Sequence, residues 1–188
     1  VLSVGPGLSD TAATNAFVDD LIKYLNKNNK KTVIDADAIN VLSKSELSSF
    51  PSDSVITPHP VELSRLINTP VKDIQNDRIK YAKLTAEKFG CCVVLKGNQT
   101  VVCTKDLEVF VNTSGNSALA KAGSGDVLTG IISGLMAQAV SVENAAKLGV
   151  YLHGLCGELA SQDLSLYSVL ATDQIDYIPQ AIKKILEA

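Results

Sequence analysis

A glycine-rich stretch that ends in a carboxylate is the part of the sequence best suited to chemistry. The residues Gly123-Ser124-Gly125-Asp126 come directly before the apolar run Val127–Ala137, which predicts a helix. The first N–H groups of a helix lack partners within the helix and lie at the positive end of its dipole, so they favour an anion. Gly123 and Gly125 would let the backbone approach a phosphate closely. This segment therefore predicts a phosphate-binding helix start.

Asp126 adds a second chemical group to this helix start. A carboxylate beside a bound phosphate is repelled by it. A carboxylate that faces a substrate hydroxyl can instead remove its proton while the neighbouring amides hold the phosphoryl group that is transferred. In a second interpretation Asp126 only caps the helix, with Gly125 as the turn before it. The spacing by itself leaves both interpretations open.

Two more glycine turns follow predicted strands. Lys96-Gly97-Asn98-Gln99-Thr100 comes after the run Cys91–Leu95, which predicts a fully buried strand. The turn is not a Walker P-loop, because GxxxxGK[ST] does not occur in the chain. A lysine and a threonine around a glycine could still contact phosphates or a ribose, and a plain β-turn with a solvated lysine is the alternative. Gly5-Pro6-Gly7 could likewise bind a ligand or be only a turn.

Histidine and aspartate residues mark other predicted strand ends. His59 lies between two prolines on a short rigid loop, and ligands of open α/β sheets bind at the carboxyl ends of strands. A solvent-facing loop histidine is the alternative. Asp35 and Asp37 end another strand and could hold Mg²⁺ through water or orient a sugar hydroxyl; Asp35 could equally cap the next element. His153, in a helical run, is interpreted as structural.

Strands and helices alternate along the chain, which indicates an α/β fold with a mostly parallel sheet in one domain. Short apolar or β-branched runs predict strands at Val1–Val4, Thr32–Ala36, Val55–Thr57 and Cys91–Leu95, then a hairpin of Thr100–Thr104 and Leu107–Val111. The first predicted helix starts at Asp10 and buries Phe17, Leu21 and Leu25, and a second, short helix follows Pro58-His59-Pro60 and runs through Leu66. Further helices are predicted at Asp73–Phe89, Val127–Ala137, Glu143–Ser161 and Thr172–Leu186. Pro179 either kinks the last helix or starts its second half.

The composition limits the classes of function. The 188 residues are 46% hydrophobic and 20% charged, which suits one sizeable core and excludes wholesale disorder. The net charge is −3 and no Lys or Arg run exceeds two residues, which argues against nucleic-acid and anionic-membrane partners. No apolar run reaches the ~18 residues of a transmembrane helix and no basic signal segment precedes Val1, so we expect a cytoplasmic protein.

The cysteines support the same compartment. The chain has four of them, at Cys91, Cys92, Cys103 and Cys156, and none forms a CxxC pair. We therefore expect buried free thiols in a reducing cytoplasm rather than disulfides or zinc ligands.

Seven segments together carry a resemblance to a known family. They are Val4–Leu8 (VGPGL), Val33–Asn40 (VIDADAIN), Thr57–Leu63 (TPHPVEL), Val94–Thr100 (VLKGNQT), Gly115-Asn116, Gly123–Gly130 (GSGDVLTG) and Tyr151–Gly154 (YLHG). In this order the chain resembles the ADP/ATP-dependent NAD(P)H-hydrate dehydratase family of the ribokinase-like superfamily along essentially its whole length. The DADAIN and TPHPxE blocks separate this family from sugar kinases. The resemblance implies a ribokinase-like three-layer α/β/α fold with a mostly parallel central sheet.

The resemblance also implies a repair reaction. ADP or ATP would phosphorylate the hydroxyl of the hydrated cofactors (S)-NADHX or (S)-NADPHX, and loss of phosphate would restore NADH or NADPH. Asp126 would be the base on that hydroxyl, and the amides of Gly123, Ser124 and Gly125 would form an anion hole. The nucleotide contacts that it implies are Lys96, Gly97, Asn98, Gln99, Thr100 and Gly125. The hydrate contacts that it implies are Gly7, His59 and Asp126.

Cofactor and assembly follow from the resemblance alone. Mg²⁺ is implied by the nucleotide, with no ligand residue assigned. The partners would be small molecules, namely the hydrates and ADP or ATP. Family members form homo-oligomers, commonly tetramers, so we expect self-association.

The sequence departs from the family pattern in several places. Ser9 and Val61 stand where the family usually has glycine, and Lys121-Ala122 occupies a segment that is typically smaller and glycine-rich. Relatives also carry strands and a glycine-rich segment upstream of the Gly-Pro-Gly strand, a part that contributes one wall of the hydrate pocket. We therefore expect residues 1–188 to be a single domain that lacks the family's N-terminal portion.

Two other functions are compatible with the same residues. A ribokinase-like kinase of a small alcohol, such as a vitamin precursor, would share Asp126 and the anion hole but would release a phosphorylated product. A relative without catalytic activity would bind nucleotide and turn nothing over.

Overall fold

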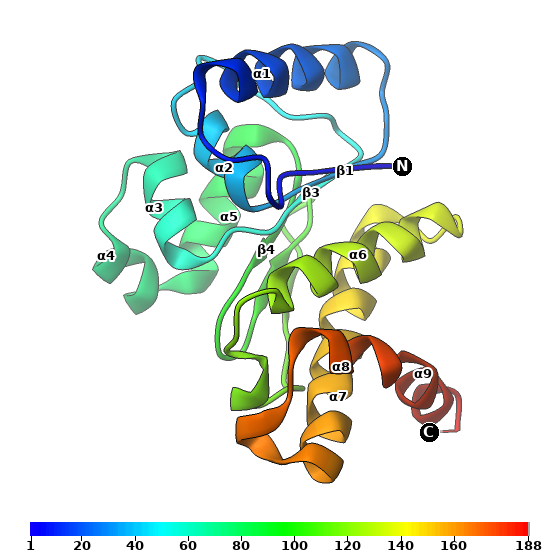
Figure 1. The fold of residues 1–188 in the computed structure, drawn as a ribbon. Coiled ribbons are helices and arrows are strands. Elements are labelled where there is room, and N and C mark those ends of the chain that lie inside the picture. Colours follow the sequence, from blue (N-terminus) through cyan, green and yellow to red (C-terminus); the bar gives the residue numbers. More distant parts are fainter. Residues whose placement is uncertain (188) are drawn as a thin grey trace.

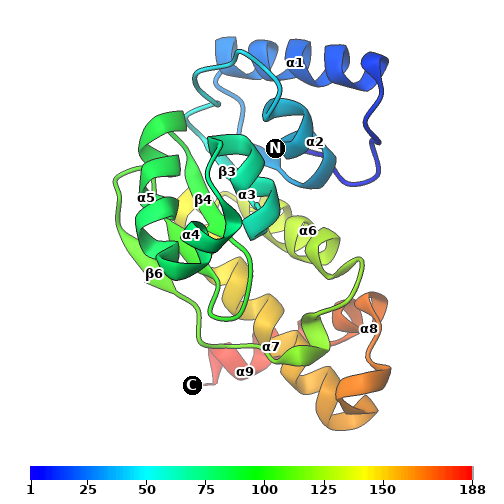
Figure 2. The same ribbon diagram turned by 90° about the vertical axis from the view of Figure 1, so that its left-hand side faces the viewer.

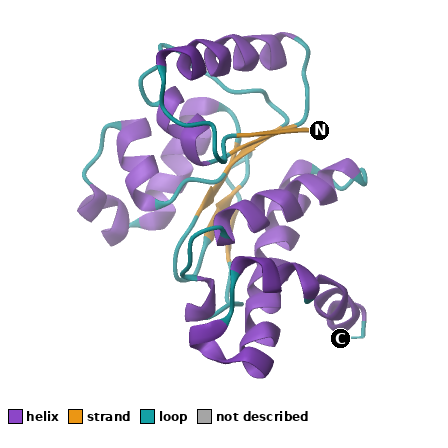
Figure 3. Cartoon of the chain, viewed as in Figure 1, coloured by secondary structure: helices purple, strands orange, loops and turns teal. Residues whose placement is uncertain are grey.

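Six short strands form one sheet in the computed structural model, which describes residues 1–187. The order across the sheet is β1 (Leu2–Val4), β2 (Thr32–Ile34), β3 (Ser54–Ile56), β4 (Cys92–Leu95), β5 (Val101–Cys103) and β6 (Val109–Val111). Strands β1 to β4 run parallel, whereas β4, β5 and β6 pair antiparallel. The predicted hairpin and the mostly parallel sheet are thus confirmed (Figure 3).

Helices cover both faces of this sheet, which makes three layers (Figures 1 and 2). One face carries α1 (Ala12–Lys27), α2 (Ala36–Leu42), α3 (Pro60–Ile67), α4 (Val71–Asn76) and α5 (Arg78–Phe89). The other carries α6 (Ser124–Ala137) and α7 (Val142–Ser168), with α8 (Ala171–Asp176) and α9 (Ile178–Leu186) packed against them and a 3₁₀ turn at Ser117–Leu119. This arrangement confirms the expected α/β/α class.

The two cores follow from the two-residue period of the strands. Successive side chains of a strand point to opposite faces. Ile34 and Ile56 therefore pack under the α1–α5 layer, whereas their neighbours Val33 and Val55 pack under α6 and α7. Because both faces are covered, every residue of β2, β3 and β4 is buried.

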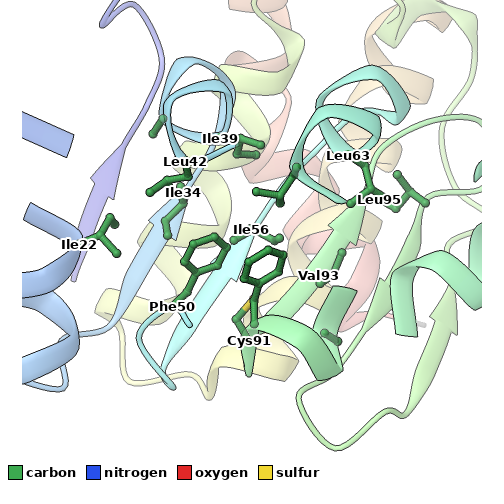
Figure 4. Close-up of a cluster of buried hydrophobic side chains, with 14 of the residues drawn as sticks. Ile22, Ile34, Ile39, Leu42, Phe50, Ile56, Leu63, Cys91, Val93 and Leu95 are labelled. Atoms are coloured by element: carbon green, nitrogen blue, oxygen red, sulfur yellow. The ribbon is translucent and has the colours of Figure 1, made fainter. Parts of the chain in front are cut away.

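Two stacked aromatic rings belong to the core under the α1–α5 layer (Figure 4). The rings of Phe50 and Phe89 lie 4.5 Å apart between centroids and are nearly parallel, at 7°. Figure 4 shows Phe50 beside Ile56 and Cys91, near the amino ends of the strands. This end of the sheet is therefore packed, while polar residues gather at the opposite end.

Helix α1 differs from its prediction in both its start and its buried face. Thr11 caps the helix, accepting a hydrogen bond from the amide of Thr14 at 3.2 Å, so Asp10 is not the cap. The side chains inside are Val18, Ile22 and Leu25. Phe17 is instead 54% exposed, because the buried face of the helix is shifted by about one residue from the predicted face.

Two predicted helices are each divided in two. Asp77 has non-helical backbone and caps a new helix by accepting from the amide of Lys80 at 3.1 Å, so the segment from Asp73 to Phe89 forms α4 and α5. The last helix is divided at Tyr177, and Pro179 lies in the first turn of α9. Proline suits that position because its missing N–H would have had no partner.

Other boundaries shift by a few residues. Strand β2 ends at Ile34, and Ala36 already belongs to α2. Helix α6 begins at Ser124, before the predicted Val127. Helix α7 extends to Ser168, with a kink at Ser165.

All four cysteines are buried free thiols, as expected. Burial raises the pKa of Cys92 to about 12 and that of Cys156 to about 11, so both remain protonated thiols. Within residues 1–187, every helix is too short or too polar to cross a membrane.

Gly149 lets α7 approach α6 closely, which gives a test of the packing. A Cβ at Gly149 would lie 2.6 Å from Cγ1 of the fully buried Ile132. Gly149→Ala should therefore lower the free energy of unfolding by about 1–3 kcal/mol. Gly134 on α6 is the matched control, because an added Cβ there meets nothing within 4 Å. Gly134→Ala should stabilise by about 0.5–1 kcal/mol.

Urea unfolding of both variants measures these differences. A Gly149→Ala protein as stable as the parent would contradict the close packing of α6 on α7.

Candidate active site

The carboxyl ends of the parallel strands bring several predicted site residues to one edge of the sheet. Asp35 follows β2, His59 follows β3 by a short loop, and Lys96 directly follows β4. The first turn of α6 lies against the same edge, since a Cβ on Gly125 would be 3.6 Å from the ammonium of Lys96. Residues from four separate stretches of sequence thus meet at this edge.

Lys96, which is partly buried, and Asp35, which is fully buried, form an ion pair at this edge. The Nζ atom of Lys96 lies 2.6 Å from Oδ1 of Asp35 and 3.7 Å from Oε2 of Glu62. The other oxygen of Asp35 accepts a hydrogen bond from the hydroxyl of Thr129 on α6, at 2.8 Å. The ammonium is therefore directed at these two carboxylates, and it also lies near Gly125 at the start of α6.

Asp35 occupies the N-cap position of α2, as one sequence interpretation expected, while its carboxylate faces Lys96 and α6. Its two carboxylate oxygens are bonded to Lys96 and Thr129, and the side chain is 1% exposed. It makes no side-chain cap bond to α2. Asp37 accepts from the amide of Ser9 at 2.8 Å, which leaves it as a support of the loop after β1.

His59 is fixed at the start of α3 by a capping box. Its Nδ1 accepts from the amides of Val61 and Glu62, at 3.1 and 3.3 Å, and Glu62 accepts from the amide of His59 at 2.7 Å. The Nε2 atom lies 3.3 Å from the second oxygen of Glu62. Desolvation lowers the pKa of His59, opposed by the charge of Glu62. A neutral ring with its proton on Nε2 satisfies all these contacts.

Glu62 is a site residue that the sequence interpretation passed over. Its side chain is buried, and it contacts both His59 and Lys96. A signal for it was present, because a glutamate three residues after a helix cap is the capping-box pattern. Glu62 thereby connects the His59 loop to the Lys96 turn.

Arg78 holds the turn at 96–100 from behind. Its guanidinium donates to the carbonyl oxygens of Leu95, at 2.7 Å, and Gln99, at 3.3 Å, and also to that of Asn98. A Cβ at Gly97 would lie 3.0 Å from an Nη atom of Arg78, and Gly97 has a φ of +148°. Partial burial lowers the pKa of Arg78. No motif in the sequence pointed to this residue.

A cavity of about 520 Å³ opens between this turn and α6. All five residues of the turn line it, together with Ser124 and Gly125. The residues with predicted nucleotide contacts therefore share one cavity. His153 of α7 also lines it. His59 and Gly7 lie outside that lining.

Asp126 is the third residue of α6 and is exposed. Gly123, with a φ of +87°, occupies the cap position, and α6 has no side-chain cap bond. The interpretation of Asp126 as a helix cap is therefore wrong. Its carboxylate is placed beside the glycine turn and borders a second, apolar hollow of about 500 Å³ between α6 and α9.

The three predicted amide donors of the anion hole differ in their availability. The amide of Ser124 donates to the carbonyl oxygen of Lys121 at 3.3 Å. Gly125 presents its amide in the first turn of α6, where the helix supplies no partner. The hydroxyl of Ser124 accepts from Gln174 at 2.9 Å, and Gln174 in turn contacts His153 at 2.9 Å.

Comparison with known proteins identifies the family. A family model described as NAD(P)H-hydrate dehydratase matches residues 1–180. The chain belongs to the NAD(P)H-hydrate dehydratase family. It is 42% identical over 177 residues to the ADP-dependent (S)-NAD(P)H-hydrate dehydratase of Neisseria meningitidis, across 92% of this chain and 59% of that protein.

Solved structures agree with this assignment. The ADP/ATP-dependent NAD(P)H-hydrate dehydratase of Bacillus subtilis, co-crystallized with ATP/Mg²⁺, has a TM-score of 0.85 and 36% identity over 97% of this chain and 63% of that one. A ribokinase-like superfamily protein of Enterococcus faecalis has a TM-score of 0.81 and 31% identity, over 97% and 63%. The expected family and ribokinase-like fold are thus confirmed. This chain spans between 59% and 63% of the length of these three relatives.

The Lys96–Asp35 pair gives a second test. Asp35→Asn would leave a largely buried ammonium with only Glu62 near it, so we expect a loss of about 3 kcal/mol in the free energy of unfolding. Adding Lys96→Met removes the unpaired charge and should recover part of this loss. Urea unfolding of the single and double variants measures both effects. A double variant less stable than Asp35→Asn would show that the pair is not the source of the loss.

His153 makes the stability depend on pH. Burial lowers its pKa from 6.5 to about 4, against the opposing effects of Gln174 and the Ser124 backbone. As the pH falls from 6.5 to about 4, the unfolded chain takes up a proton at His153 and the folded chain does not, so stability must fall. The loss is on the order of 3 kcal/mol.

The measurement is the free energy of unfolding of the parent and of His153→Gln across this pH range. The variant should lose less stability on acidification. Parallel curves for the two proteins would refute a neutral buried His153.

Proposed function

We propose that this chain uses ADP or ATP to dehydrate (S)-NADHX and (S)-NADPHX to NADH and NADPH. The observation that carries the proposal is the cavity between the 96–100 turn and the glycine start of α6, with Asp126 exposed directly after Gly125, which lines that cavity. Relatives named for this activity support it. The products besides the reduced cofactor are AMP and phosphate from ADP, or ADP and phosphate from ATP.

The proposed reaction has two stages. The carboxylate of Asp126 removes the proton of the hydrate hydroxyl as the oxygen attacks the terminal phosphoryl group of the nucleotide. The lone pair of the ring nitrogen then expels phosphate, which is a far better leaving group than hydroxide, and loss of a ring proton restores the double bond. Phosphorylation therefore solves the chemical problem of a poor leaving group.

The other predicted site residues divide into those that would bind the nucleotide and those that would bind the hydrate. Lys96, Gly97, Asn98, Gln99, Thr100 and Gly125 would contact the nucleotide, since all of them line the cavity. Gly7 and His59 would contact the hydrate. Gly7 has a φ of +72° and no atom within 4 Å of where a Cβ would be, so it leaves open space in the turn after β1.

Mg²⁺ would enter with the nucleotide rather than occupy a site of its own. Within residues 1–187, no group of three or more His, Cys, Asp or Glu side chains could hold a metal ion. Mg²⁺ is commonly bound through substrate phosphates and one or two carboxylates. When bound, it would neutralise charge on the phosphates, and the residues of this chain would do the positioning.

Location and assembly belong to the same proposal. We propose a cytoplasmic protein that forms a homo-oligomer, with a tetramer as the form that the resemblance favours. Size-exclusion chromatography with light scattering tests the assembly.

The decisive experiment incubates the chain with NADH hydrate, Mg²⁺ and either ADP or ATP. The near-ultraviolet absorbance of the dihydronicotinamide ring should rise only when nucleotide is present. A stable phosphorylated product without this rise would favour a small-alcohol kinase. Nucleotide binding with no reaction at all would favour a relative without catalytic activity.

Asp126→Asn tests the assigned base. We expect turnover to fall by about 10²–10⁴-fold, while the affinity for ADP and ATP stays within a few-fold. Asp20→Asn, on the exposed side of α1, is a matched control that should change neither quantity. Equal losses of turnover and nucleotide affinity in Asp126→Asn would assign Asp126 a structural role.

A further inference from the structure

Ser124 brings a buried hydroxyl to the lining of the nucleotide cavity. It is the first residue of α6, it is only 4% exposed, and it lines the cavity beside Gly125. Its amide already donates to the carbonyl oxygen of Lys121 at 3.3 Å. The side chain of Ser124 is therefore better placed than its amide to meet a ligand.

Gln174 determines the direction of that hydroxyl. Its carboxamide is completely buried, and its Nε2 atom donates to the Ser124 hydroxyl oxygen at 2.9 Å. Its carbonyl oxygen lies 2.9 Å from Nε2 of His153. Because a carboxamide oxygen can only accept, this contact requires a proton on Nε2 of His153. The donors thus run in one direction, from His153 through Gln174 to Ser124.

The last donor in this series, the hydroxyl of Ser124, can donate its hydrogen to a ligand. A hydroxyl that accepts from Gln174 keeps its own hydrogen, which must point away from Gln174. Ser124 lines the cavity, so the cavity is the space into which this hydrogen can point. His153 stays neutral because burial lowers its pKa to about 4, so the direction of the donors does not change near neutral pH.

Helix α8 is held firmly against the glycine turn, which keeps Gln174 in place. The ammonium of Lys121 donates to the carbonyl oxygens of Tyr167, at 2.9 Å, and of Val169. A Cβ at Gly123 would lie 3.0 Å from Cβ of Ala171. The segment that carries Gln174 therefore rests directly on the start of α6.

We propose that the hydroxyl of Ser124 donates a hydrogen bond to the phosphoryl group that is transferred, and that Gln174 and His153 are positioning residues that aim it. This inference rests on the proposed function for the identity of the transferred group. It adds a side-chain donor to the backbone amides at the start of α6. Such a donor stabilises charge that grows on the phosphoryl oxygens during transfer.

The test is a double-variant cycle of Ser124→Ala and Gln174→Met, with Ser133→Ala as matched control. Ser133 lies on the same helix, and its hydroxyl donates to the carbonyl oxygen of Thr129 at 2.7 Å. Calorimetric titration with AMP, ADP and ATP in the presence of Mg²⁺ gives the affinity that each additional phosphate adds. Turnover of NADH hydrate is measured in parallel.

Ser124→Ala should leave AMP affinity unchanged and lower the affinity gained with the terminal phosphate by about tenfold. Turnover should fall by about 100-fold. Gln174→Met should lose part of the same gain, and the double variant should match Ser124→Ala, because Gln174 acts through Ser124. Ser133→Ala should resemble the parent.

Two results would overturn the inference. One is a Ser124→Ala protein with the parent's affinity gain and turnover. The other is a double variant whose loss is the product of the two single losses, which would mean that Gln174 acts independently of Ser124. Should Ser124→Ala fail to fold in a thermal melt, Ser124→Cys keeps the size with a weak donor and should show the same losses.

The affinity cycle separates this inference from the proposed function. A parent chain that binds ATP but does not convert the hydrate would overturn the function, and the affinities would still decide the role of Ser124. A parent that binds none of the three nucleotides would overturn both.

Discussion

The largely buried ion pair between Lys96 and Asp35 is the interaction on which the site geometry depends. A charge removed from water is costly unless it is paired and hydrogen-bonded. The ammonium has Asp35 at 2.6 Å and Glu62 at 3.7 Å, and Asp35 also holds the hydroxyl of Thr129. The pair therefore joins the ends of β2 and β4 to α6, so that the two sides of the nucleotide cavity keep their relative position.

The backbone segments around that cavity contain glycine and would be mobile on their own, so each is held by a polar side chain from a neighbouring helix. Arg78 bonds two carbonyl oxygens of the turn at 96–100 and that of Leu95 just before it. Gln174 of α8 holds Ser124 at the glycine-rich start of α6. Since a buried polar group without a partner costs about 1–3 kcal/mol, each of these contacts also fixes a single arrangement. Support of this kind leaves the amide of Gly125 and the exposed carboxylate of Asp126 available to ligands.

Local patterns in the sequence were sufficient for most of the fold. The strands all lie within two residues of their predicted bounds, because short β-branched runs between turn residues have few alternatives. The prediction of the buried face of α1 was wrong, because it placed Phe17 in the core and Phe17 is 54% exposed. The break at Asp77 was missed because the apolar period continues through it, although Asp77 itself is a good capping residue.

The sequence by itself determined the chemical groups: a glycine turn that precedes a helix, a carboxylate in the first turn, and a lysine and a histidine after buried strands. Only the tertiary structure decided what each group faces. Asp35 meets Lys96 across 61 residues and Thr129 across 94, and Gln174 meets Ser124 across 50. Local propensity acts over a few residues, whereas such contacts depend on the parallel register of the sheet and the packing of α6 and α8 upon it. For that reason Asp35 proved to be a buried counter-ion, and Gln174 had no signal in the sequence.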